Sequence, residues 1–151
     1  MKIEDFEKLM KDADKDVEMP DSYEGIIKKN NLLPAIIQKW IKLYQDQQYV
    51  YSNLKVELAE LYGDLYKCFK LPKHTKELQS KYNFMVNEFW DNAKAIESQI
   101  NVVPAYIKKM KQVNQQKYIL DFIEKTLKNM ENLGYVIKNY IDYKKTMMAV
   151  S

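Results

Sequence analysis

Side chains that could perform covalent or acid–base chemistry are scarce in this sequence of 151 residues. It contains one cysteine, Cys68, and one histidine, His74. Cys68 falls within an apolar helical repeat, so we interpret it as a core residue rather than a nucleophile. Glu57 and Glu60 share a predicted helix face with Lys55, which is typical of solvated charge. We therefore expect a protein that is not an enzyme and that has no catalytic residue, metal site or cofactor.

Other functional classes are also disfavoured by the composition. The three glycines stand alone at positions 25, 63 and 134, so the sequence has no glycine-rich phosphate loop. The N-terminus is acidic and does not resemble a signal peptide. No segment approaches the roughly 18 uninterrupted apolar residues that a membrane span requires, so no membrane association is expected. A single cysteine fits a reducing cytoplasm.

The most informative cluster combines lysines with aromatic rings between residues 62 and 82. Residues 67–81 contain five lysines and one glutamate, a local net charge of +4. This combination suits single-stranded nucleic acid, because lysines neutralise phosphates and exposed rings stack on bases of any identity. Alternatively, the rings only pack against the neighbouring helix. The candidate nucleic-acid-binding residues are Lys67, Lys70, Lys73, Lys76, Lys81, Tyr66 and Phe69.

Charge is distributed unevenly along the chain. Residues 1–24 contain four lysines and nine acidic residues, residues 25–100 contain eleven and eight, and residues 101–151 contain nine and four. An acidic head before a basic body suggests that the body binds a polyanion and that the head is a detachable or competing arm. Solvated charged faces are the alternative. All 24 basic residues are lysines, so no bidentate guanidinium group is available to hold a phosphate.

Few glycines and prolines leave few positions for turns, which favours long helices over many short strands. Residues 1–10 are expected to form a short amphipathic helix, followed by a mobile polar linker over 11–24. From Leu33 to Cys68 apolar residues recur at alternating intervals of four and three, which predicts a coiled-coil helix over 33–69. Pro34 would then lie in its first turn, where proline is tolerated.

Two more helices are predicted in the second half of the chain. A connector over 71–75 precedes a second helix over 78–100, which continues the same spacing. Pro104 can open a third helix that extends to the end of the chain. Gly134 lies inside this helix and is interpreted as either a helix end or a kink.

The third helix carries two neighbouring apolar stripes, one more than a single packing partner covers. We interpret this pattern as contact with neighbouring copies of the chain, and burial inside one monomer is the alternative. The candidate oligomerisation residues are Leu127, Met130, Val136, Ile137, Tyr140 and Ile141.

Read as a whole, the sequence resembles the UvsY family of recombination mediators of T-even-type phages. The resemblance rests on the opening residues 1–5, on Lys39-Trp40, and on the aromatic and basic segment 61–69, LYGDLYKCF. Its most specific part is residues 133–145, LGYVIKNYIDYKK, preceded by the similar segment 119–127.

This resemblance implies an all-α protein of long antiparallel helices with coiled-coil-like packing and a C-terminal oligomerisation helix. It implies a hexameric or heptameric homo-oligomer that binds single-stranded DNA in the cytoplasm of the infected bacterial host. The implied partners are a UvsX-like recombinase, which the mediator helps to load, and the phage single-strand-binding protein that it displaces. We expect an acidic N-terminal arm and linker over 1–30 and a helical DNA-binding and oligomerisation domain over 31–151. A coiled-coil protein–protein adaptor without nucleic-acid binding is the alternative function.

Overall fold

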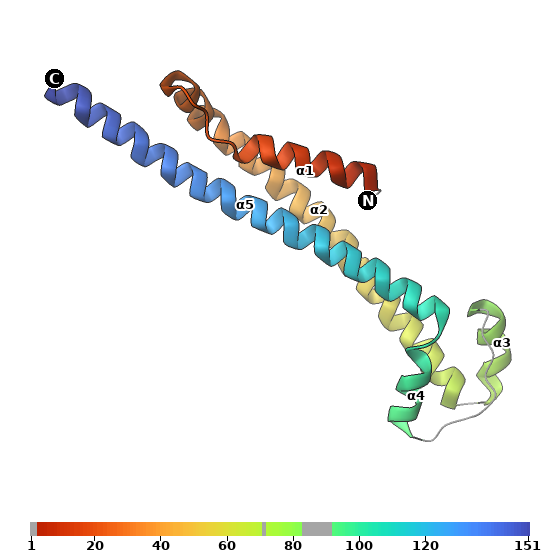
Figure 1. Ribbon diagram of the computed structural model, residues 1–151. Helices are drawn as coiled ribbons and strands as arrows, with labels where there is room; N and C mark the ends of the chain where they lie inside the picture. The colour runs from red at the N-terminus through yellow and green to blue at the C-terminus, as the bar shows by residue number, and fades with distance from the viewer. Residues whose placement is uncertain (1–2, 71, 83–91) are drawn as a thin grey trace. The chain divides into compact units, whose positions relative to one another are not determined.

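The computed structural model describes residues 3–70, 72–82 and 92–151, and within these ranges every regular element is an α-helix (Figure 1). The predicted all-α class is confirmed. The five helices are α1 (Ile3–Val17), α2 (Tyr23–Lys70), α3 (Pro72–Tyr82), α4 (Ala93–Ile100) and α5 (Pro104–Val150). No described helix has an apolar stretch of the length needed to span a bilayer.

The chain divides into two compact units whose boundary runs through the two long helices. Unit 1 comprises residues 1–48 and 118–151, and unit 2 comprises residues 49–117. This division differs from the expected domains of residues 1–30 and 31–151. The reason is that α1 packs on the first half of α2 and the middle of α5 instead of forming a separate arm.

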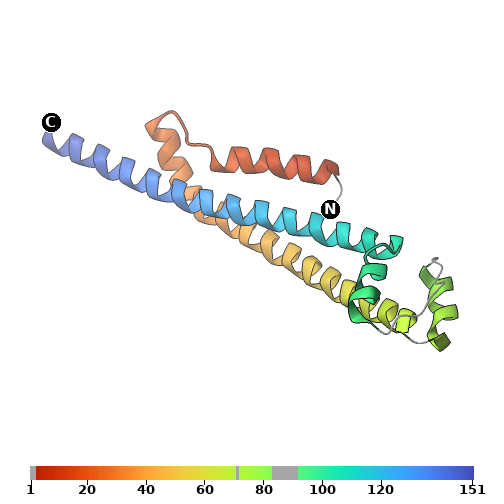
Figure 2. The same cartoon turned by 60° about the horizontal axis from the view of Figure 1, so that its bottom comes forward.

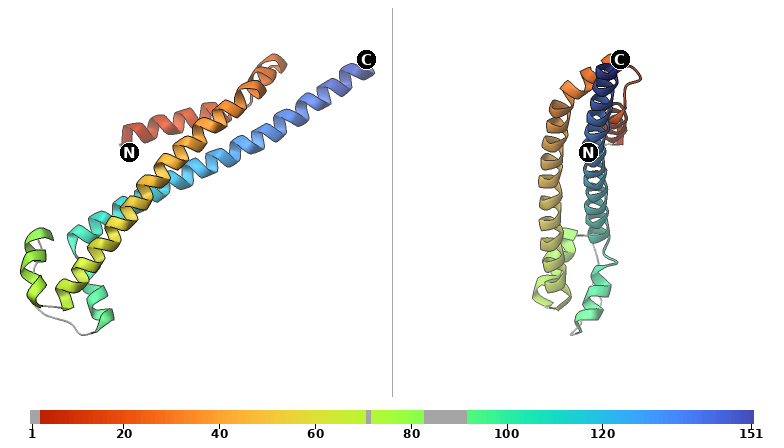
Figure 3. Two further views of the ribbon diagram at one scale, coloured as in Figure 1. Left: turned by 180° about the vertical axis from the view of Figure 1, so that it is seen from behind. Right: turned by 90° about the vertical axis from the view of Figure 1, so that its left-hand side faces the viewer.

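Unit 1 is built on the antiparallel pairing of α2 and α5, with α1 lying against both (Figures 2 and 3). One core cluster joins Ala13 of α1 and Trp40 of α2 to Ile123 of α5 and its neighbours. A second cluster joins Ile26 and Leu33 of α2 to α5. The heptad-like spacing of α2 therefore predicts its buried face correctly at Leu33 and Trp40, which are 5% and 0% exposed.

The start of α2 differs from the prediction by ten residues. The helix begins at Tyr23, and the hydroxyl of Ser22 caps it by accepting a hydrogen bond from the Gly25 amide at 3.0 Å. Burial of Ile26 in the core holds this first part of the helix in place. Pro34 consequently lies inside the helix, on its exposed side, where water can hydrate the carbonyl that proline leaves without a donor.

The expected mobile linker over 11–24 is also wrong, because α1 continues to Val17. Its apolar stripe extends past residue 10 through Ala13 and Val17, which pack into the unit 1 core. The segment between α1 and α2 is therefore only Glu18–Ser22.

Gly134 does not end a helix, since α5 continues from Pro104 to Val150. A Cβ atom built on Gly134 would lie 3.3 Å from Cδ2 of Leu33, which is tighter than most contacts of real Cβ atoms. Glycine here therefore permits a close approach of α2 and α5 within unit 1.

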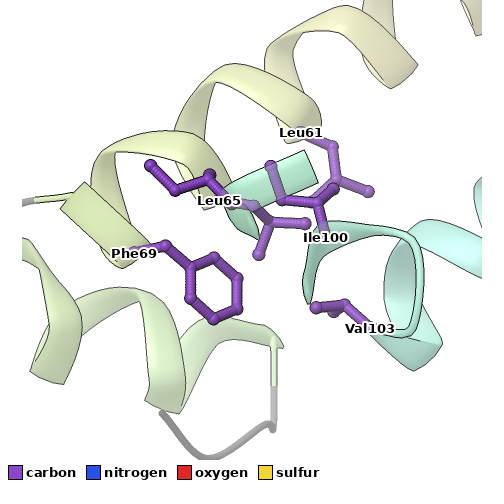
Figure 4. Packing of buried hydrophobic residues seen from close by; sticks show 6 residues of the cluster. Leu61, Leu65, Phe69, Ile100 and Val103 are labelled. Atoms are coloured by element: carbon purple, nitrogen blue, oxygen red, sulfur yellow. The ribbon is translucent and has the colours of Figure 1, made fainter. Parts of the chain in front are cut away.

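Unit 2 contains the end of α2, α3, α4 and the start of α5. Its core is formed by Leu61, Leu65 and Phe69 of α2, by Ile100 at the end of α4 and by Val103 just before α5 (Figure 4). Ile96 of α4 completes this cluster. The Asn92 side chain caps α4 by accepting a hydrogen bond from the Lys94 amide at 2.9 Å.

The predicted connector and second helix need correction in the described part of unit 2. Pro72 begins α3 directly after α2, because proline is well suited to the first turn of a helix, so 71–75 is not simply a connector. The expected helix over 78–100 corresponds to the end of α3 and to α4, and part of it falls on residues 83–91, outside the described residues.

Candidate nucleic-acid interface

Most of the predicted lysine cluster lies on two consecutive helices of unit 2. Lys67 and Lys70 are exposed in the last turn of α2, where positive charge is stabilised by the negative end of the helix dipole. Lys76 and Lys81 are exposed on α3, and the side chain of Lys73 lies outside the described residues. Unit 2 contains eleven lysines and seven acidic residues, so its net charge is +4. The predicted cations thus share one basic unit.

Lys81 differs from the other lysines because it is already paired. Its Nζ lies 3.7 Å from Oδ2 of Asp64 and 5.1 Å from the centre of the Tyr82 ring. The Tyr82 hydroxyl donates a hydrogen bond to the same carboxylate oxygen at 2.9 Å. The pKa of Lys81 is raised, first by its hydrogen bond to Tyr82 and also by Asp64. Asp64 therefore links α3 to α2 beside the exposed lysines.

Three tyrosines form a row beside the end of α2. The rings of Tyr62 and Tyr66 are stacked with centroids 6.3 Å apart, and Tyr106 of α5 lies 6.1 Å from Tyr62. All three are half-buried. Lys70 Nζ lies 5.8 Å from the centre of the Tyr66 ring, which places a cation next to an aromatic surface. This is the local arrangement that a phosphate and an adjacent base require.

Neither Tyr62 nor Tyr106 is among the candidate residues, although both rings lie beside the candidate Tyr66 in this row. The spacing of Tyr62 and Tyr66 along one helix indicates that those two rings are neighbours. Tyr106 reaches them only through the pairing of α2 with α5, which sequence spacing alone does not determine. Burial raises the pKa of Tyr62, with a smaller contribution from Glu97.

Phe69 does not fit the predicted role of a stacking platform. It is 4% exposed and packs with Leu65, Ile100 and Val103 in the unit 2 core (Figure 4). A ring in this position cannot present its face to a base. The alternative that some rings only pack against the helix seam therefore holds for Phe69.

Two further groups of lysines lie on α5, outside the predicted cluster: Lys108, Lys109 and Lys111 in unit 2, and Lys138, Lys144 and Lys145 in unit 1. In unit 2, Lys108 and Lys111 are exposed, whereas Lys109 Nζ lies 2.6 Å from Oε2 of Glu57 and is largely neutralised. In unit 1, Lys138 and Lys145 are exposed, and Lys144 Nζ lies 5.7 Å from the centre of the Tyr140 ring.

The candidate oligomerisation residues occupy two different environments in unit 1. Met130, Ile137 and Ile141 are 0–7% exposed and are covered by packing within the chain. Leu127 and Tyr140 are half-buried against the same clusters. The alternative of burial inside one monomer therefore holds for the first three. Val136 is 54% exposed and remains available for contact with another chain.

Val136 belongs to a larger exposed apolar surface near the end of α5. From residue 142 to the end of the chain, every side chain except that of Lys144 is exposed. The exposed large apolar side chains in this part of α5 are Tyr135, Val136, Tyr143, Met147, Met148 and Val150, which we call the α5 apolar surface. An apolar surface of this kind is typical of a protein–protein contact.

Comparison with known proteins shows a shared fold. No protein-family model and no curated protein sequence matches the chain. Crystal structures of the bacteriophage T4 recombination mediator protein UvsY match it over nearly its whole length. The lattice type II structure gives a TM-score of 0.73 at 13% identity and covers 98% of each chain. The lattice type IV structure gives a TM-score of 0.72 at 14% identity and covers 97% of this chain and 99% of the UvsY chain. The lattice type I structure gives a TM-score of 0.70 at 12% identity and covers 93% of this chain and 98% of the UvsY chain. The chain therefore has the UvsY fold.

Proposed function

We propose that this protein is a recombination mediator that binds single-stranded DNA. It helps to load a phage recombinase onto DNA covered by single-strand-binding protein. The observation that carries the proposal is the likeness to UvsY, whose chain and this one superpose over 98% of their lengths. The basic and aromatic surface of unit 2 supports it independently, because that surface has the chemistry single-stranded DNA requires.

The proposed DNA-binding residues are Lys67, Lys70, Lys76 and Lys81 with Tyr66, and Lys73 is retained from the sequence prediction. The lysines neutralise phosphates without reading sequence. Their ammonium groups are mobile point charges, and a site without arginine forms no rigid bidentate contacts. Contacts of this kind suit DNA that must be transferred to a recombinase. The protein itself performs no chemical step in this role.

The proposed partners are a UvsX-like recombinase, the phage single-strand-binding protein and further copies of the chain. The protein would act in the cytoplasm of the infected bacterial host. We assign the contacts between copies to the α5 apolar surface, in place of the buried residues Ile137 and Ile141. A hexamer or heptamer would bring several basic units onto one DNA strand and strengthen binding through multivalency.

The coiled-coil adaptor remains the second candidate function. Its supporting observation is that α2 also exposes apolar side chains in unit 2, with Tyr49 at 70% and Val56 at 57% exposure. An adaptor would use such a face to bind other proteins and would not need the lysines.

A matched pair of charge variants tests the DNA-binding role. The double substitution Lys67→Gln and Lys70→Gln removes two exposed cations beside the tyrosine row. The control is Lys55→Gln with Lys94→Gln, which makes the same charge change at exposed positions elsewhere in unit 2. We expect the first pair to weaken binding of labelled single-stranded DNA much more than the second. Equal effects would contradict the assigned site, and no binding by the unmodified chain at low salt would favour the adaptor.

A further inference from the structure

The acidic helix α1 is held against unit 1 by contacts with basic and aromatic residues. The carboxylate oxygen Oδ2 of Asp16 lies 3.2 Å from Lys39 Nζ and accepts a hydrogen bond from Trp40 Nε1 at 2.9 Å. Lys29 Nζ donates a hydrogen bond to the carbonyl oxygen of Lys15 at 3.2 Å. Two lysines and the indole of α2 thus use oxygen atoms of α1 as their acceptors.

Near its start, α1 covers aromatic rings instead. The ring of Phe6 lies 5.7 Å from that of Tyr118 and 5.4 Å from that of Phe122, both on α5. Tyr118 is nonetheless 64% exposed. The surface of unit 1 that α1 contacts therefore combines lysines with aromatic side chains, as the proposed DNA site of unit 2 does.

The charges of unit 1 show what α1 neutralises. Unit 1 as a whole contains 13 lysines and 14 acidic residues. Helix α1 contributes three of these lysines and six of the acidic residues. The remainder of unit 1 therefore has ten lysines and eight acidic residues, a net charge of +2. With α1 in place, this positive charge is offset by the net charge of −3 on α1.

Few side chains of the 15-residue helix α1 are fully buried against the rest of unit 1. Of the α1 side chains whose burial is described, only Ala13 is fully buried, while Phe6, Leu9 and Val17 are half-buried. A pocket of about 150 Å³ that is partly open to solvent lies between Asp14 of α1 and the α5 residues around Lys125. Residues 18–22, which lie outside any helix, connect α1 to α2.

From these observations, we propose that α1 masks a second polyanion-binding surface in unit 1 and that single-stranded DNA displaces it. Phosphates take the place of the Asp16 carboxylate at Lys39 and of the Lys15 carbonyl at Lys29. Bases take the place of Phe6 against Tyr118 and Phe122. This inference rests on the proposed DNA-binding function and adds a regulated site to it.

The fluorescence of Trp40 can be used to measure the release of α1 directly in the 151-residue chain. It is 0% exposed, and its indole nitrogen is bonded to α1. Replacing Trp90 by Phe leaves Trp40 as the sole tryptophan. On saturation with unlabelled oligo(dT), we expect the emission of Trp40 to change and its quenching by acrylamide to change with it. Unchanged emission and quenching, with DNA binding shown in parallel by anisotropy of labelled DNA, would overturn the proposal.

Binding variants separate loss of charge from loss of packing. Phe6→Ala loosens α1 without changing any charge, and Asp16→Asn removes the charge facing Lys39 while keeping an acceptor for Trp40. Glu7→Gln is the control, because Glu7 is an exposed α1 residue with the same charge. We expect severalfold tighter DNA binding for the first two variants and less than a twofold change for the control.

The outcomes distinguish this inference from the proposed function. If the unmodified chain binds DNA and Phe6→Ala binds no more tightly, the masking proposal is overturned and the unit 2 site is unaffected. If neither the unmodified chain nor Phe6→Ala binds DNA at low salt, both proposals fail. Binding that appears only in Phe6→Ala would support masking.

Discussion

The indole nitrogen of Trp40 and the carboxylate of Asp16 are joined by a 2.9 Å hydrogen bond that fixes α1 to α2. Trp40 is fully buried, so its N–H group depends on this acceptor for a hydrogen bond. The bond joins a partly buried acidic residue of the N-terminal segment to the core residue Trp40 of unit 1. It explains why this segment is an ordered helix in the fold even though its composition resembles that of a solvated arm.

Removing this acceptor should destabilise unit 1. Asp16→Ala leaves the buried Trp40 N–H without its partner, which costs about 1–3 kcal/mol of unfolding free energy. Asp16→Asn keeps an oxygen acceptor and should cost less. Urea unfolding of the three proteins, followed by circular dichroism, measures the difference. Equal stability of Asp16→Ala and the unmodified chain would show that the bond contributes little.

Gly63 and Gly134, each far from the ends of a long helix, should respond differently to alanine. Nothing lies within 4 Å of a Cβ atom built on Gly63, so Gly63→Ala gains helix propensity without a clash. We expect it to stabilise the protein by about 0.5–1 kcal/mol. Gly134→Ala gains the same propensity but presses on Leu33 at 3.3 Å, so its net effect should be smaller. Thermal unfolding measures which variant gains more stability. A larger gain for Gly134→Ala than for Gly63→Ala would contradict the close approach of α2 and α5 at Gly134.

Folding and self-association should be separable along α5. Ile137 is 0% exposed, so Ile137→Ala should lower the unfolding free energy by about 2–5 kcal/mol. Val136→Asp combined with Met147→Asp changes exposed residues and should leave circular dichroism and stability nearly unchanged. Sedimentation should then show a smaller assembly for this double variant. If its mass equals that of the unmodified chain, the α5 apolar surface is not the contact between copies.

Alkaline pH should destabilise unit 2 through two tyrosines. Burial is the main reason that the pKa values of Tyr62 and Tyr82 lie above 10.0, because it disfavours the phenolate. A folded-state pKa above the unfolded value contributes stability that is complete below pH 10 and is lost as the pH rises through the folded-state value. Replacing both residues by Phe should reduce the loss of stability above pH 10. Urea unfolding at a series of pH values tests this, and identical pH dependence would argue against it.

The fold could be predicted from the sequence where one pattern determines one structure. The alternating spacing from Leu33 to Cys68 correctly indicates a long helix with one buried face, because burial on a helix follows its period. The beginning of that helix could not be found in this way, since its N-cap Ser22 lies upstream of the regular spacing. Composition also obscured α1, whose acidic residues hide an apolar stripe continued by Ala13 and Val17.

The candidate site was predictable in its charge but not in its aromatic part. Exposed lysines follow directly from sequence, because burying an unpaired ammonium is costly. Whether a ring is buried or accessible depends on which helices meet beside it. Phe69 and Tyr66 are three residues apart, yet only Tyr66 remains half-exposed. Tyr106 of α5 meets the neighbouring ring of Tyr62. Pairing of Lys81 with Asp64 likewise depends on how α3 packs against α2.

The affinity of the 151-residue chain for mixed-sequence single-stranded DNA, measured across a range of salt concentrations, decides whether its lysines bind the DNA backbone. We expect binding at low salt. The logarithm of the binding constant should fall linearly with the logarithm of the salt concentration, with a slope of about −0.7 per phosphate contacted. We also expect similar affinities for strands of different sequence, because lysine contacts and stacking ignore base identity. Absence of binding at low salt, or an affinity that does not change with salt, would contradict the proposed DNA-binding function.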